Sequence, residues 1–113
     1  MYEYRARIAS IYDADTVRLD IDCGFSVWLN HVPFRLAGID APELGKPGGR
    51  EARDWLRVML PAGTDLVVIT QKDAKEKYGR YLATLYLPGD HVTSINQRLI
   101  DAGHARPYNG GAR

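Results

Sequence analysis

The chain has 113 residues, a formal net charge of +1 and an apolar fraction of 45%, as expected of a single compact domain covering residues 1–113. These values argue against a strongly basic or acidic protein, and a lone cysteine, Cys23, excludes an internal disulfide or a zinc-binding cysteine cluster. No apolar run approaches the roughly 20 residues of a membrane span, and the first residues lack a secretory signal. We therefore expect no membrane partner and a cytoplasmic location for the chain as given; secretion would require that a leader had been removed.

The first third of the chain alternates between apolar and polar residues, as antiparallel strands do. Residues 2–11 alternate loosely and residues 16–22 strictly. Cys23 and Gly24 have the length of a tight hairpin turn. The apolar positions then continue at Phe25, Val27, Leu29, Val32 and Phe34. We predict three antiparallel strands, the third reaching Ile39.

The rest of the chain predicts two helices and two further strands. Apolar residues recur at helical spacing after a glycine-rich segment, at Ala52, Trp55, Leu56 and Met59. Strands are predicted at 66–69 and 80–87, joined by a charged loop. Ser94 or Thr93 can cap a second helix, whose apolar residues are Ile95, Leu99 and Ala102. This order predicts a mainly β fold with helices, a five-stranded OB-type barrel with two packed helices.

Asp13 and Asp15 lie between the first two predicted strands. Two residues apart on an extended backbone, their carboxylates lean toward the same side. Neighbouring carboxylates repel each other, so a site that keeps them together usually holds a cation. The alternative is an ordinary turn, where Asp is common.

Further oxygen-bearing groups lie at the end of the third predicted strand, which Pro42 terminates. Asp40 and Glu43 supply carboxylates, and the backbone carbonyl of Ala41 lies between them. A set without His or Cys suits a hard cation, Ca²⁺, with Mg²⁺ as the competitor. The alternatives are a strand-end cap for Asp40 and a solvated loop acid for Glu43.

Two arginines complete the candidate site. Arg35 lies inside an apolar strand and therefore needs a partner, either a structural carboxylate or a phosphate. Arg80 opens the predicted fifth strand, and Tyr78 just before it is a candidate for base stacking. Two arginines, an acid and a cation are the groups that phosphoryl-transfer chemistry uses. The histidines have no metal-binding spacing, and we expect them to be structural or exposed.

With these residues in view, the chain resembles the staphylococcal nuclease (thermonuclease) family. The resemblance rests on DADTV at 13–17, FRLAGIDAPE at 34–43 and KYGRYLA at 77–83, with a weaker match over 95–105. It implies an OB barrel with helices. It also implies an endonuclease that hydrolyses phosphodiesters of DNA and RNA with one Ca²⁺ ion and releases 3′-phosphate ends. We expect a monomer.

The resemblance assigns a role to each carboxylate that would hold the ion. Asp15 and Asp40 look like metal ligands, with the backbone carbonyl of Ala41 as a third. Asp13 resembles an acid that contacts the metal ligands without binding the ion itself. The best-known member of the family has Thr in place of Ala41, which leaves the carbonyl but removes a hydroxyl.

The remaining roles concern the substrate. Glu43 resembles the residue that positions the attacking water, and the loop after it is shorter than in the best-known family member. Arg35 and Arg80 resemble the pair that grips the phosphate. Lys77 and Tyr78 resemble contacts to the nucleotide's terminal phosphate and base.

Two other hypotheses remain open. Degenerate repeats of this family are catalytically silent barrels that bind nucleic acid or protein, and a structural domain could simply pair its acids with its arginines. Silent modules typically lose some of the carboxylates and arginines, whereas every such position is filled here. We therefore favour the enzyme.

Overall fold

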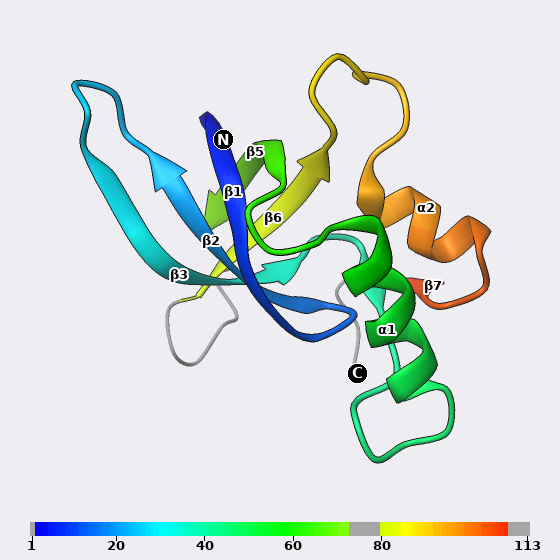
Figure 1. The fold of residues 1–113 in the computed structure, drawn as a ribbon. Coiled ribbons are helices and arrows are strands. Elements are labelled where there is room, and N and C mark those ends of the chain that lie inside the picture. Colours follow the sequence, from blue (N-terminus) through cyan, green and yellow to red (C-terminus); the bar gives the residue numbers. More distant parts are fainter. Residues whose placement is uncertain (1, 73–79, 109–113) are drawn as a thin grey trace.

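The computed structural model describes residues 2–72 and 80–108. Its elements, labelled in Figure 1, are β1 (Tyr2–Asp13), β2 (Thr16–Asp22), β3 (Trp28–Leu36), β4 (Ile39–Asp40), α1 (Gly49–Met59), β5 (Asp65–Lys72), β6 (Tyr81–Tyr86), α2 (Ile95–Asp101) and β7 (Arg106–Pro107).

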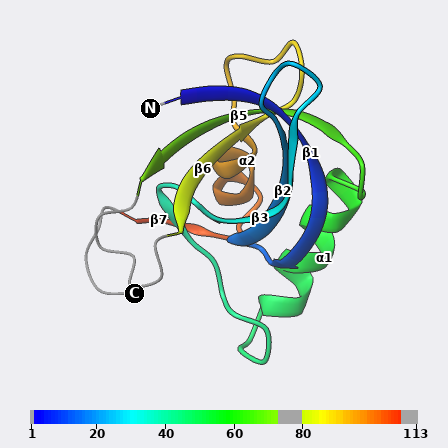
Figure 2. The same cartoon turned by 90° about the vertical axis from the view of Figure 1, so that its left-hand side faces the viewer.

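Five strands close a barrel in the order β1-β2-β3-β6-β5, and β4 pairs with β7 in a separate two-stranded sheet. Within the barrel, β3 and β6 run parallel and the other pairs are antiparallel. Figure 2 shows the strands as a ring with α2 behind it, while α1 lies along the outside next to β1. The predicted five-stranded OB-type barrel with two packed helices is confirmed.

The alternating strand and the first helix bury the residues that their spacing predicts. Val17, Leu19 and Ile21 of β2 face the core, and α1 buries Ala52 and Leu56. In α2 the expected Ile95 and Leu99 are buried, but Ala102 lies after the helix and is exposed. The cap of α2 is Ser94, whose side chain accepts the Gln97 N–H at 3.0 Å.

The hairpin between β2 and β3 differs from the prediction. It is not a two-residue turn but a loop closed by Cys23 N–H donating to the Val27 carbonyl and Val27 N–H to that of Gly24. Phe25 and Ser26 have positive φ of 55° and 62°, which takes them out of the strand ladder. Phe25 is fully exposed, and Cys23, Val27 and Leu29 are also exposed rather than in the core.

The third strand stops earlier than predicted, at Leu36, and a turn at Ala37 and Gly38 leads into β4. Buried Asn96 of α2 holds this turn. Its side-chain amide donates to the carbonyls of Ala37 (2.9 Å) and Ala83 (3.0 Å), and its oxygen accepts the Leu85 N–H (3.0 Å). Because the turn separates Arg35 from Asp40, Asn96 fixes the position of one relative to the other.

Candidate active site

Asp13 and Asp15 sit in the tight connection between β1 and β2. Both are buried, and Asp15 N–H donates to Asp13 Oδ1 at 3.2 Å. Arg57 of α1 holds the approach to this turn, since its guanidinium donates twice to the Ile11 carbonyl, at 3.3 and 2.8 Å. Burial, reinforced by the neighbouring Asp15 carboxylate, raises the pKa of Asp13 from 3.8 to about 6. Two acids are therefore kept together at an electrostatic cost.

The Asp15 carboxylate joins this turn to the segment that follows β3. Its Oδ2 accepts the Ala41 N–H at 3.1 Å, across 26 residues of sequence, and Arg35 Nη2 at 3.4 Å. The backbone carbonyl of Asp15 also accepts the Leu36 N–H at 2.9 Å. The structure thus places Asp15, Arg35 and Ala41 together.

Arg35 and Arg80 both lie at the parallel β3–β6 pair of the barrel. Arg35 is opposite Leu82, and Arg80 is the residue just before β6 begins at Tyr81. The Nε of Arg35 is buried and has no hydrogen-bond partner within the described residues. A buried donor without a partner is costly, and an anionic ligand would satisfy it.

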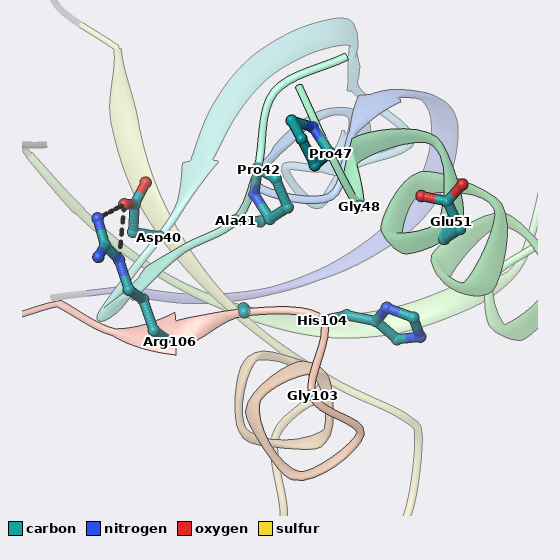
Figure 3. Close-up of a pocket in the computed structure, with 10 residues that line it drawn as sticks. Asp40, Ala41, Pro42, Pro47, Gly48, Glu51, Gly103, His104 and Arg106 are labelled. Atoms are coloured by element: carbon teal, nitrogen blue, oxygen red, sulfur yellow. Dashed lines mark hydrogen bonds and ion pairs between the residues drawn. The ribbon is translucent and has the colours of Figure 1, made fainter. Parts of the chain in front are cut away.

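Asp40 has a partner that the sequence analysis missed. Arg106 of β7 donates to Asp40 Oδ2 from Nε at 3.2 Å and from Nη2 at 2.9 Å. Figure 3 shows the pair at one end of a cleft of about 590 Å³, with His104 in the middle and Glu51 at the far end. No local pattern could have revealed this pair, because its members lie 66 residues apart.

Glu43 lies in the exposed loop that follows Pro42. Its carbonyl accepts the Lys46 N–H at 3.0 Å, and the start of α1 packs on the same carbonyl at Gly49. The described residues contain no group of three or more Asp, Glu, His or Cys side chains close enough to hold a metal ion. Glu43 is therefore not gathered with Asp15 and Asp40 into one cluster of carboxylates.

Lys77 and Tyr78 lie outside the described residues. His104 is half-buried and packs against Trp55, with ring centres 5.3 Å apart and the rings tilted by 44°, as a structural histidine would. Neither helix of the described part of the chain is long and apolar enough to cross a membrane.

The donor atoms offered by Asp15, Asp40 and Ala41 are all oxygens, the type that hard divalent cations prefer. Asp15 and Asp40 offer carboxylate oxygens and Ala41 a carbonyl, while the N–H of Ala41 already ties the two segments together. Ca²⁺ accepts such oxygen ligands in loose geometry and completes its shell with water. A nearby divalent charge would also favour the ionised form of Asp13, whose pKa is raised first by burial and then by the neighbouring Asp15.

Comparison with known proteins gives a consistent result. The family model described as staphylococcal nuclease homologue matches residues 33–112. An uncharacterized endonuclease of Escherichia coli is 30% identical over 106 residues, which cover 94% of this chain and 62% of that protein. A micrococcal nuclease of Shigella flexneri is 30% identical over 112 residues, covering 94% of this chain and 59% of that protein. A staphylococcal-like nuclease of Arabidopsis thaliana is 33% identical over 76 residues, covering 67% and 23%. The chain thus spans only about three fifths of the length of the two bacterial relatives.

Proposed function

The chain belongs to the staphylococcal nuclease family, and we propose that it is a Ca²⁺-dependent endonuclease that hydrolyses DNA or RNA and leaves 3′-phosphate ends. The observation that carries this proposal is the position of the Asp15 carboxylate. It contacts both Arg35 and the Ala41 backbone, so the proposed cation ligands lie next to a proposed phosphate-binding group.

In this proposal Asp15, Asp40 and the Ala41 carbonyl hold the cation. When bound, Ca²⁺ would supply positive charge against the phosphate oxygens of the substrate. Asp13 keeps Asp15 in place by accepting its backbone N–H.

In this proposal two arginine side chains bind the phosphate. Arg35 directs a guanidinium to the site from β3, and its partnerless buried Nε is suited to a phosphate oxygen. Arg80, the residue just before β6, supplies the second guanidinium. Together they would stabilise the additional negative charge of the five-coordinate transition state. Lys77 and Tyr78 remain the proposed contacts to the next phosphate and base.

Glu43 orients the attacking water and takes its proton. The water oxygen forms a bond to phosphorus while the bond from phosphorus to the 5′-oxygen breaks. The departing oxygen takes a proton from solvent, and the phosphate stays on the 3′-oxygen. The exposed position of Glu43 gives water direct access to it.

The test is digestion of single-stranded DNA and RNA with Ca²⁺, with Mg²⁺ and with a chelator, with the ends of the products identified by mass spectrometry. We expect cleavage with Ca²⁺ and none with the chelator. Glu43→Gln and Arg80→Ala should each lower kcat by about 10²-fold or more. Glu3→Gln and Arg5→Ala, which change exposed residues of the same types in β1, should leave kcat unchanged.

Two outcomes would contradict the proposal. Cleavage that is indifferent to the chelator would remove the cation from the mechanism. Substrate binding without cleavage, or near-normal kcat in both the Glu43 and the Arg80 variants, would instead favour a binding module.

A further inference from the structure

Arg106 has no role in the proposed mechanism, although it binds Asp40, a proposed cation ligand. Both of its hydrogen bonds, at 3.2 and 2.9 Å, go to the same oxygen of Asp40. Two donors on one carboxylate oxygen neutralise much of its charge and occupy lone pairs that a metal ion would otherwise use.

The backbone holds the pair in place. Asp40 and Arg106 are direct partners in the antiparallel β4–β7 ladder, and Ile39 pairs with Pro107. The Tyr108 N–H extends this pairing by donating to the Gly38 carbonyl at 2.9 Å. Residues directly opposite in an antiparallel pair have adjacent side chains. Arg106 is therefore aimed at Asp40 by the fold, whichever ligand is bound.

The charges at the two carboxylates already balance without a metal ion. Arg35 is paired with Asp15, and Arg106 with Asp40. A divalent cation entering between the carboxylates adds two positive charges, so it is repelled by both guanidinium groups. Arg35 is held in the wall with 19% of its side chain exposed, whereas the Arg106 side chain is 73% exposed and has room to turn into solvent.

We propose that Arg106 is a positioning residue that occupies Asp40 in the cation-free protein and competes with the cation for it. The inference rests on the proposed function, because it assumes that Asp40 is a cation ligand. Arg106 then keeps Asp40 oriented toward the site and sets how much Ca²⁺ is needed to fill it.

The experiment measures Ca²⁺ binding by titration calorimetry without substrate. Arg106→Gln should bind Ca²⁺ more tightly than the wild type, with a Kd on the order of three- to tenfold lower, because one competing charge is gone. Arg106→Lys should lie in between, since it keeps the charge but loses the two-donor geometry. Arg7→Gln breaks another exposed ion pair, with Asp65, and should leave the Kd unchanged.

Thermal unfolding supplies a second readout that a merely structural role would not move. In chelator, Arg106→Gln should be no more stable than the wild type. In excess Ca²⁺ its rise in Tm should exceed that of the wild type, because tighter binding stabilises the folded state more.

The outcomes separate this inference from the function on which it rests. If Asp40→Asn abolishes Ca²⁺ binding but Arg106→Gln leaves it equal or weaker, the competitor role is wrong and the cation site stands. If the folded wild type takes up no Ca²⁺, both are wrong.

Discussion

Gly49 offers a sharp test of how the loop that carries Glu43 is held. It is the first residue of α1, it is buried, and its backbone is not in the left-handed region. A Cβ there would lie 2.0 Å from the Glu43 carbonyl oxygen, 2.7 Å from its carbon and 3.1 Å from Leu44 N. These are backbone atoms, so they cannot turn aside as a flexible side chain would. Gly49→Ala must therefore move either the helix or the loop that carries Glu43.

Two opposing effects set the size of the change. Replacing Gly by Ala inside a helix normally stabilises a protein by about 0.5–1 kcal/mol. Forcing a methyl group into a filled space costs about 1–3 kcal/mol. Because the 2.0 Å contact is with backbone, we expect a cost in the upper part of that range and a net loss of about 1–2 kcal/mol, which lowers Tm by about 4–8 °C in a domain of this size. An atomic displacement of about 1 Å at Glu43 should also reduce kcat by about 10²-fold.

Urea unfolding and kcat at a temperature where both proteins are folded would check this. Val58→Ala is the matched control: it lies in the same helix, its side chain is 81% exposed, and the exchange also favours helix. It should change stability by less than about 0.5 kcal/mol and leave kcat alone. If Gly49→Ala were as stable and as active as the wild type, the close packing of α1 on the Glu43 loop would be wrong.

Three further changes test individual polar contacts of the fold. Asn96→Ala leaves the buried Leu85 N–H without its acceptor and takes a donor from the Ala37 and Ala83 carbonyls, although Ala83 still accepts the Ala37 N–H. It should therefore cost about 1–3 kcal/mol in urea unfolding, and an Asn96→Ala variant of native stability would contradict the network. In chelator, the raised pKa of Asp13 means that this residue's contribution to wild-type stability falls as pH rises from about 4 through about 6. Asp13→Asn keeps an oxygen acceptor and should remove this fall. At pH 7 the variant should be more stable by about 1–2 kcal/mol, after discounting for the titration that Asp13 shares with Asp15. The pKa of Asp90 is lowered, chiefly by the backbone N–H of Val92 and then by Arg98. Its contribution is present above pH 3.8 and is lost as pH falls through its lower folded pKa, so Asp90→Asn should denature at a higher pH during acid titration, with identical acid midpoints counting against it.

The architecture could be predicted because strict alternation and helical spacing report burial directly. In a closed barrel one face of each strand points into the core, and Val17, Leu19 and Ile21 occupy that face of β2. Phe25 and Leu29 follow the same spacing but are exposed. Phe25 lies in the five-residue loop with two positive φ angles, and Leu29 pairs with Ile21 ahead of a register shift near His31, which also has a positive φ. Composition does not encode that loop geometry, because Phe and Ser rarely adopt such angles.

The site could be predicted only in part. The motif residues Asp15 and Arg35 are adjacent as expected, because each stands at a strand end or strand position that the barrel fixes. Arg106 gave no signal, since it follows a helix in a segment without periodicity. Asn96 likewise reads as one polar residue on a short helix, and only the fold shows that three backbone groups depend on it.

Barrel closure also has a kinetic consequence. The first strand takes its second neighbour from far along the chain, with Tyr2 opposite Thr70 and Arg7 opposite Asp65. Such distant pairing brings a large loop-closure entropy into the rate-limiting step, which is typical of domains that fold in milliseconds to seconds. During synthesis, β1, β2 and β3 would leave the ribosome before β5 and β6. The outer edges of β1 and β3 would therefore lack their hydrogen-bond partners until the second half of the chain is made.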